Sequence, residues 1–319
     1  MVRKTNDKYH GVLLYHKPLG ITSHDAVQEV RRMIAQRSVG HTGTLDPQAE
    51  GLLLMCLGSA TKISRFLTNH DKVYEAEITL GRRSSTYDRE GVDFMLPANE
   101  IPELDRFAMN EIMDGFRGEI NQTVPAFSAV HVEGERLYKQ ARAGKEVDVP
   151  TRRITIKELQ LIDWTEPLLT ITVTCSAGTY IRSLAHDIGE TIGCGAFLSR
   201  LRRTRVGRFD LDRALSRDSL ATTLAHGQLS QKLLSPRDAL DFPAITVTPE
   251  FARFITTGRD LTVADIISCE RPLAPGDVAL LVGANSQALA VVKIQQSFCQ
   301  DSPRFEPNGK LVSYVRVLN

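Results

Sequence analysis

The chain has 319 residues, of which 42% are hydrophobic and 24% are charged, and its formal net charge is +1. This length predicts about two domains, the balance is typical of a globular protein, and the charge excludes a uniformly basic nucleic-acid-binding chain. The five cysteines lack CxxC or Cys/His spacing, which argues against a disulfide framework or a zinc site. No apolar run has the length of a signal peptide or a membrane span, so we expect a chain in the reducing cytoplasm without membrane contact.

The predicted elements, in chain order, are a helix over 22–37, strands over 51–58, 73–81 and 169–175, and a helix over 179–193. The first helix has a potential capping box, because Thr22 is followed three residues later by Asp25. Segment 51–58 is an apolar run bounded by glycines, which is typical of a buried strand, whereas the next two strands alternate apolar and polar residues. In the last helix the apolar stripe leaves Arg182 outside it, near the first turn.

Strands and helices are mixed without a regular βαβ alternation, which predicts an α+β fold rather than a doubly wound parallel sheet. Residues from about 125 to 153 are rich in charged and small residues, and we expect them to form an insertion that leaves the core. The composition changes after 235–243, and short strands separated by turn signals follow. We therefore expect one domain over 1–242 and a small β-domain over 243–319.

Charge is unevenly distributed along the chain. Segment 196–208 contains five arginines and no acid, whereas segment 99–120 contains six acids and two arginines. A near-neutral total can therefore hide one basic face and one acidic face. Taken alone, the arginine-rich segment is more typical of a solvated helix edge than of an RNA-binding site.

One carboxylate, Asp46, lies in a loop that leads into the apolar run. Pro47 favours an extended conformation at Asp46, and Gly40 and Gly43 permit tight turns or close backbone approach. A loop braced by a buried strand is a common place for a catalytic group. The alternative is an Asx-type turn in which the carboxylate only binds backbone amides, and the local sequence favours that alternative.

Motifs of other enzyme classes do not occur in the sequence. There is no GxxxxGK[ST] phosphate loop, no HExxH motif and no GxSxG motif. No second carboxylate is close enough in sequence to suggest a glycosidase pair. An enzyme with this sequence would therefore use cofactor-free chemistry on one carboxylate.

The motif "GHTGTLDPQAEGLL" resembles the signature of the TruB family, the bacterial tRNA pseudouridine-55 synthases. Further segments resemble that family in the same order over nearly all of residues 10–210: "GVLLYHKPLGITSHDAV", "KVYEAEITLG", "PAFSAVHVEGERLYKQARAG", "CSAGTYIRSLAHDIG" and "LSRLRRTRVGRF". Six motifs in order are far more specific than any one of them. The resemblance implies a pseudouridine synthase fold, with a mixed, largely antiparallel central sheet flanked by helices. It also implies that the C-terminal β-domain is similar to a PUA-like RNA-binding module.

The resemblance assigns roles to five residues. Asp46 matches the family's nucleophile, Arg182 matches the arginine that pairs with it, and Tyr74 matches the tyrosine that stacks on the target base. Leu201 matches an apolar residue of the uracil pocket, and His41 matches a histidine near the vacated base stack. For each, the structural alternative is an ordinary core or surface residue.

The implied reaction isomerises the T-loop uridine at tRNA position 55 to pseudouridine and needs no cofactor and no metal. The target base must be flipped out of its stack, the N-glycosidic bond breaks, and a carbon–carbon bond forms from C5. The aspartate could attack either ribose C1′ or uracil C6. The implied partner is the T-arm stem-loop of tRNA, and we expect a monomer.

Basic residues in the matching segments are candidate RNA contacts. They are Lys17, Lys139, Arg142, Arg202, Arg203 and Arg205. The sequence departs from the family pattern at His16, Glu50, Leu54, Ser84, Ser85 and His131. None of these departures falls on Asp46, Tyr74 or Arg182.

Two other functions are compatible with the sequence. The first is the catalytic subunit of an RNA-guided pseudouridylation particle, a related branch that typically lacks the long insertion present here. The second is a non-catalytic tRNA-binding or tRNA-folding module, against which the joint presence of Asp46, Tyr74 and Arg182 argues.

Overall fold

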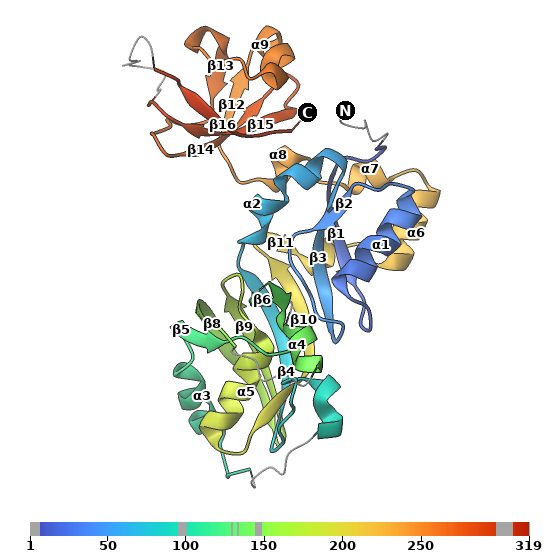
Figure 1. Cartoon of the computed structure of the whole chain (residues 1–319), viewed down its shortest axis with the longest axis vertical. Helices are drawn as coiled ribbons and strands as arrows, with labels where there is room; N and C mark the ends of the chain where they lie inside the picture. The colour runs from blue at the N-terminus through green and yellow to red at the C-terminus, as the bar shows by residue number, and fades with distance from the viewer. Residues whose placement is uncertain are drawn as a thin grey trace.

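The computed structural model describes residues 7–94, 101–128, 130–132, 134–143, 149–297 and 309–318. These residues form an elongated molecule in which a large mixed sheet is followed, at one end, by a smaller sheet built from the C-terminal segment (Figure 1).

The large sheet contains nine of the described strands. Along the sheet the order is β1 (Gly11–Lys17), β3 (Ala49–Leu57), β10 (Ala196–Val206), β4 (Lys72–Leu80), β9 (Leu168–Cys175), β8 (Thr151–Thr165) and β5 (Gly118–Thr123). Two short strands extend it, β2 (Val39–His41) beside β3 and β11 (Phe209–Asp210) beside β10. The pairing of β3 with β10 is parallel, and the other pairings are antiparallel. The expected mixed, largely antiparallel sheet is thus confirmed.

The remaining elements up to residue 239 are helical, apart from one short hairpin. The α-helices are α1 (Ser23–Ile34), α2 (Ser64–Thr68), α3 (Arg106–Asp114), α4 (Leu137–Arg142), α5 (Ile181–Ile192), α6 (Arg217–Ala225), α7 (Leu229–Lys232) and α8 (Pro236–Ala239). The 3-10 segments are η1 (Gly58–Ile63), η2 (Arg89–Phe94) and η3 (Leu211–Arg213). Strands β6 (His131–Val132) and β7 (Glu135–Arg136) form the hairpin, which with α4 occupies the predicted insertion.

The apolar run that becomes β3 is buried on both faces. Leu53 and Met55 pack in one cluster with α1, and Leu52 and Leu54 pack in another with η1 and α2. A strand covered on both faces has no polar side, which explains a continuous apolar run instead of an alternation. This strand is the rigid element to which the Asp46 loop is attached.

A second sheet forms the C-terminal end, in the order β13 (Ile266–Cys269), β12 (Ala244–Val247), β14 (Val278–Val282), β15 (Ala288–Ile294) and β16 (Val312–Val317). It is accompanied by α9 (Pro249–Phe254), η4 (Ile255–Thr257) and η5 (Val263–Asp265). Leu280 and Val291 of this sheet belong to the same buried cluster as Leu52 and Leu54 of β3. The two sheets are therefore joined by a continuous apolar contact.

The elements predicted from local patterns are close to those observed. The capping box forms in both directions between Thr22 and Asp25, and helix α1 follows it. The arginine-rich segment 196–208, however, is not a helix edge. It contains strand β10, in which Leu201 and Arg203 are buried and Arg202 is partly exposed.

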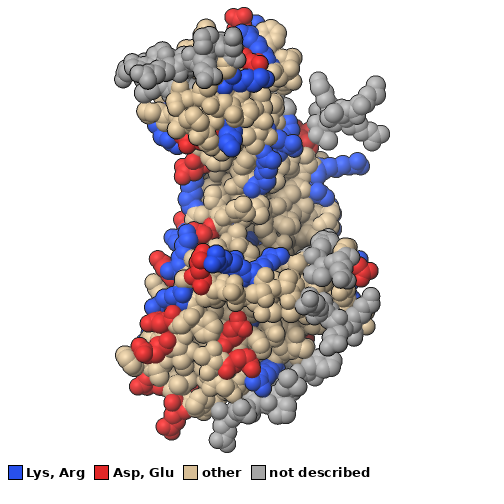
Figure 2. All heavy atoms as spheres, turned by 60° about the vertical axis from the view of Figure 1, so that its left-hand side comes forward, with Lys and Arg blue, Asp and Glu red and all other residues tan. Residues whose placement is uncertain are grey.

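Acidic side chains gather at the end of the molecule away from the C-terminal sheet, and basic ones lie across its middle on the face seen in Figure 2. No helix among the described residues is long and apolar enough to cross a membrane.

Candidate active site

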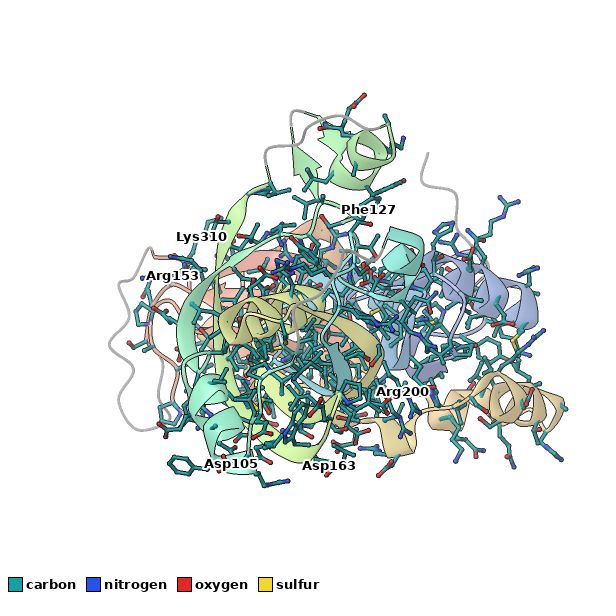
Figure 3. All side chains as sticks on the ribbon, turned by 90° about the horizontal axis from the view of Figure 1, so that it is seen from below. Asp105, Phe127, Arg153, Asp163, Arg200 and Lys310 are labelled. Carbon is teal, nitrogen blue, oxygen red and sulfur yellow. The ribbon has the colours of Figure 1, made fainter. Side chains whose placement is uncertain are left out.

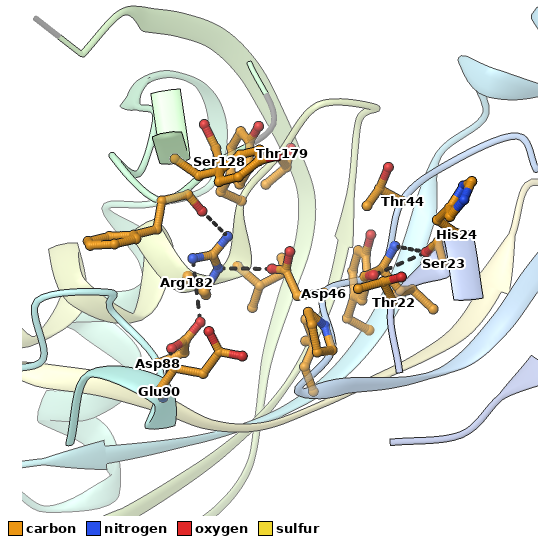
Figure 4. A pocket seen from close by; sticks show the side chains of 18 of the residues that line it. Thr22, Ser23, His24, Thr44, Asp46, Asp88, Glu90, Ser128, Thr179 and Arg182 are labelled. Atoms are coloured by element: carbon orange, nitrogen blue, oxygen red, sulfur yellow. Dashed lines mark hydrogen bonds and ion pairs between the residues drawn. The ribbon is translucent and has the colours of Figure 1, made fainter. Parts of the chain in front are cut away.

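A cavity of about 630 Å³ opens on the large sheet beside the Asp46 loop. The residues predicted to act together all line it: Asp46, Tyr74, Arg182, Leu201 and His41. They come from four different strands or loops and one helix, and Figure 4 shows the Asp46 carboxylate facing the Arg182 guanidinium. The tertiary structure thus brings together side chains that are up to 160 positions apart in the sequence, from His41 to Leu201 (201 − 41 = 160).

The backbone of the Asp46 loop is held on both sides of the carboxylate. The Oγ of Ser23 accepts from the Leu45 amide at 2.8 Å and donates to the Leu45 carbonyl at 3.1 Å. The Gly20 amide donates to the Pro47 carbonyl at 2.8 Å. Because these bonds fix the residues before and after Asp46, the direction of its side chain is set by the loop rather than by solvent.

Arg203 also holds the backbone of the Asp46 loop. This residue is 2% exposed, and it donates from Nε to the Leu52 carbonyl at 2.7 Å and from Nη1 to the Thr44 carbonyl at 3.2 Å. Strand β10 can approach β3 this closely because residue 51 is glycine. A Cβ on Gly51, whose φ is +113°, would lie 2.3 Å from the Arg203 carbonyl oxygen.

Arg182 is the central cation of the site, and its side chain is only 6% exposed. Its Nε lies 2.9 Å from Oδ2 of Asp46, but the N–H does not point at this oxygen, so the contact is an ion pair and not a hydrogen bond. The guanidinium also donates to the carbonyls of Thr86 and Phe127, both at 3.2 Å. A planar group with several donors suits this arrangement, which fixes the guanidinium while leaving the Asp46 side chain 39% exposed.

A second carboxylate, Asp88, contacts the opposite edge of Arg182. Its Oδ2 lies 3.4 Å from Nη1 of Arg182, and its side chain is 7% exposed. Oδ1 accepts from the Thr86 hydroxyl at 2.6 Å and from the Glu90 amide at 3.0 Å. Our sequence prediction did not include Asp88 as a site residue, although the Thr-x-Asp pattern at 86–88 was a signal for it.

Ser23 was also missing from the predicted site residues. Nothing in the sequence marks Ser23 as more than the start of a helix.

Burial shifts the pKa values of three polar side chains in and beside the cavity. Burial raises the pKa of Tyr74, so its hydroxyl remains protonated at neutral pH. Burial also lowers the pKa of His41, and its Nδ1 lies 3.1 Å from the Gly43 carbonyl oxygen, which accepts a hydrogen bond from a neutral ring. Lys17 is fully buried, its pKa is lowered by burial to about 8, and it donates to the carbonyls of Pro18 and Ile21 at 2.8 Å.

The predicted RNA contacts divide into three groups. Lys17 and Arg203 are buried and donate to backbone carbonyls, so the phosphate contacts predicted for them stay a prediction that this burial disfavours. Arg202 and Arg205 line a separate hollow on the opposite face of β10, where Arg202 lies 3.9 Å from the Glu75 carboxylate. Lys139 is exposed on α4, and the side chain of Arg142, on the same helix, lies outside the described residues.

In the part of the chain that the structure describes, no group of three or more His, Cys, Asp or Glu side chains is arranged to hold a metal ion. The groups that line the cavity include the Asp46, Asp88 and Glu90 carboxylates, the buried Arg182 guanidinium, the Tyr74 phenol and the His41 imidazole.

Comparison with known proteins identifies the family of the chain. A family model described as TruB family pseudouridylate synthase, N-terminal domain, matches residues 31–181, and one described as tRNA pseudouridylate synthase B, C-terminal domain, matches residues 182–240. The chain is 44% identical over 253 residues to the tRNA pseudouridine synthase B of Azoarcus sp. (strain BH72), covering 79% of this chain and 83% of that protein. The chain belongs to the TruB family. The family resemblance predicted from the sequence motifs is thus confirmed.

A second curated relative supports the family, and two solved structures share the fold. The tRNA pseudouridine synthase B of Cupriavidus taiwanensis is 42% identical over 298 residues, covering 90% of this chain and 91% of that protein. Among solved structures, the one titled "Structure of H/ACA RNP bound to a substrate RNA containing 2'-deoxyuridine" contains a chain that matches with a TM-score of 0.73 and 24% identity, covering 97% of this chain and 85% of its own. "Crystal Structure of a Cbf5-Nop10-Gar1 Complex" matches with a TM-score of 0.73 and 23% identity, covering 99% and 92%. At this identity the two structures support the TruB fold alone.

Proposed function

We propose that this TruB-family enzyme isomerises the T-loop uridine at position 55 of tRNA to pseudouridine, with Asp46 as the nucleophile. Synthesis of pseudouridine in tRNA follows from the family and from relatives named tRNA pseudouridine synthase B. The position in the tRNA and the identity of the nucleophile are our inferences. The observation that carries them is a carboxylate that faces the cavity while a buried guanidinium holds one of its oxygens.

The ion pair explains how one carboxylate can be both fixed and reactive. Arg182 contacts Oδ2 of Asp46, and the exposure of the side chain leaves Oδ1 as the oxygen that we assign to the substrate. Arg182 cannot turn away easily, because the Thr86 and Phe127 carbonyls and the Asp88 carboxylate hold its other edges. A nucleophile held this way needs little reorganisation when the substrate arrives.

A cavity of about 630 Å³ has room for one extruded nucleotide. Flipping a base out of a folded loop costs a few kcal/mol, and stacking on an aromatic ring recovers about 1–3 kcal/mol. We assign this stacking to Tyr74, whose ring lines the cavity, and the apolar wall to Leu201. His41, also in the lining, is the candidate for the space that the base leaves in the RNA.

The reaction balances without a co-reactant. The bond between N1 of uracil and C1′ of ribose breaks, a bond between C5 and C1′ forms, the C5 proton leaves, and N1 takes up a proton. Asp46 supplies the electron pair that forms a transient bond to the substrate, at either ribose C1′ or uracil C6, and recovers it on release.

The wider proposal concerns the partner and the domains. We propose a cytoplasmic monomer that binds the T-arm stem-loop, with a catalytic domain over 1–242 and a PUA-like RNA-binding domain over 243–319. The separate five-stranded sheet that begins at Ala244 supports this division. The exposed Lys139 in the insertion is the remaining described candidate for a phosphate contact near the cavity.

The test uses a T-arm RNA labelled with tritium at uridine C5. We expect the wild type to release the label, and we expect Asp46→Ala and Asp46→Asn to release none while binding the RNA with nearly unchanged affinity. Asp163→Asn is the control, because Asp163 is exposed and lies far from the cavity residue Phe127 (Figure 3). Label release by Asp46→Asn at a rate close to that of Asp163→Asn would contradict the nucleophile.

The same assay separates the two alternative functions. A catalytic subunit of an RNA-guided particle would need a guide RNA before it releases label, whereas our proposal expects release from the T-arm with the protein alone. A non-catalytic binding module would bind the T-arm but release no label even as the wild type.

A further inference from the structure

One face of helix α5 carries side chains that all contact the same loop. Arg182, His186 and Glu190 are spaced by four residues, which places them in a row along the helix. The loop over 82–88, between β4 and η2, lies along this row. The row begins in the cavity at Arg182 and runs away from it.

Each member of the row has its own partner in the loop. Glu190 accepts two hydrogen bonds from Arg83, at 2.6 and 2.9 Å. The ring of His186 stacks on the ring of Tyr87, with centroids 4.0 Å apart and an interplanar angle of 12°. Arg182 binds the loop on either side of Tyr87, at the Thr86 carbonyl and the Asp88 carboxylate described above. The loop is therefore attached to the helix at three successive turns.

Tyr87, which stacks on His186, has a backbone conformation that tyrosine rarely adopts. Tyr87 has a φ of +62°, in the left-handed region that side chains other than glycine, asparagine and aspartate seldom occupy. Such a residue stays in place only where its surroundings fix it. The Leu198 amide donates to the Tyr87 carbonyl at 2.9 Å, and the Tyr87 amide donates to the Ser84 carbonyl at 3.1 Å. The stack on His186 fixes the side chain.

The two residues next to Tyr87 are the ones that contact Arg182. The Thr86 carbonyl accepts from Nη1 at 3.2 Å, and Asp88 lies 3.4 Å from the same nitrogen. A rotation of the backbone at Tyr87 would therefore move both acceptors together. The Arg83–Glu190 pair is solvent-accessible, with side chains 31% and 40% exposed, so solvent screens its attraction.

We propose that His186 and Tyr87 are a positioning pair for the reaction: their stack holds Thr86 and Asp88 against Arg182 and so orients the Asp46 carboxylate. This inference rests on the proposed role of Asp46. Neither ring lines the cavity among the described residues, so the pair acts through Arg182 and does not touch the substrate.

The test compares His186→Ala, which removes the stack, with His186→Phe, which keeps an aromatic ring. Thr191→Ala is the control on the same helix, because Thr191 is exposed and its hydroxyl bonds only to the Asp187 carbonyl of α5 among the described residues. We expect His186→Ala to lower the single-turnover rate of label release about three- to tenfold, with T-arm affinity unchanged. We expect His186→Phe to restore most of the rate.

A double-mutant cycle separates positioning from a general effect on folding. Because the stack acts through both Thr86 and Asp88, His186→Ala should lower the rate of the Asp88→Asn enzyme by a smaller factor than it lowers the wild-type rate. Independent effects that multiply would overturn the inference, as would a His186→Ala rate equal to that of Thr191→Ala. If His186→Ala does not fold, Tyr87→Asn gives the same test from the loop side, because asparagine accepts a positive φ but removes the ring. An active Asp46→Asn enzyme would instead refute the proposed nucleophile, so the two failures are distinguishable.

Discussion

Replacing Asp88 by asparagine removes one charge from the site while keeping the shape of the side chain. The amide would retain an oxygen for the Thr86 hydroxyl and the Glu90 amide, which now bind Oδ1 at 2.6 and 3.0 Å. It would lose the ion pair with Arg182 at 3.4 Å. The guanidinium would then be held on that edge by carbonyl groups alone, and its hold on Asp46 would loosen.

The free-energy effect of Asp88→Asn is the difference between two opposing contributions. At 3.4 Å and an effective dielectric constant of about 20, the attraction between the two charges is about 5 kcal/mol. Against this, a carboxylate on a side chain that is 7% exposed has a desolvation cost of several kcal/mol, which the substitution relieves. The difference leaves about 1–3 kcal/mol, and we expect the rate of pseudouridine formation to fall by about 5- to 150-fold.

The assay is single-turnover release of tritium from C5 of the T-arm uridine, with RNA affinity measured separately by filter binding. We expect the rate to fall and the affinity to stay within about twofold, because the Asp88 carboxylate contacts Arg182 and its side chain is only 7% exposed. Asp163→Asn provides a matched carboxylate-to-amide control at an exposed position. A rate for Asp88→Asn equal to that of the control would refute the role of this ion pair, and an equal loss of rate and affinity would show that Asp88 acts in binding.

Two further predictions concern stability. Burial lowers the pKa of Lys17 from 10.5 to about 8, so between these pH values the unfolded chain binds more protons than the folded one, and stability contributed by Lys17 rises with pH. The stability of the wild type relative to Lys17→Met, measured by urea unfolding, should therefore increase from pH 8 to pH 10, and a constant difference would contradict the shifted pKa. Gly51→Ala should destabilise the protein by about 2–4 kcal/mol, because the added Cβ meets the Arg203 backbone at a positive φ. Gly227→Ala is the control, since Gly227 also has a positive φ but no heavy atom within 4 Å of the added Cβ, and equal losses in the two variants would rule out the contact as the cause.

Local patterns were sufficient for the elements that depend on neighbouring residues. The capping box of Thr22 and Asp25 is an interaction between near neighbours, and the apolar run of β3 and the apolar stripe of α5 can be read from residue spacing alone. Ordered motifs were sufficient for the TruB family, and they named five residues that the fold does bring into one cavity.

Only the tertiary structure showed on which face of β10 each arginine lies and what it contacts. Strand alternation separates Arg202 from its neighbours, but it does not say which face meets the cavity or which is covered. The parallel pairing of β10 with β3 places Leu201 beside Ala49, buries Arg203 under the Asp46 loop and turns Arg202 to the opposite face. The family resemblance made Arg203 a candidate phosphate contact, whereas in the structure it binds the Leu52 and Thr44 carbonyls.

The sequence by itself determined the secondary structure near Asp46, the family and the candidate nucleophile, because these depend on local chemistry and on motifs in order. Only the tertiary structure showed which groups besides Arg182 hold the candidate nucleophile and its loop. Ser23, Asp88 and Arg203 act through contacts between segments up to 159 residues apart, as from Thr44 to Arg203. Such contacts are fixed by strand pairing and by the satisfaction of buried carbonyl groups and charges, which no local pattern records.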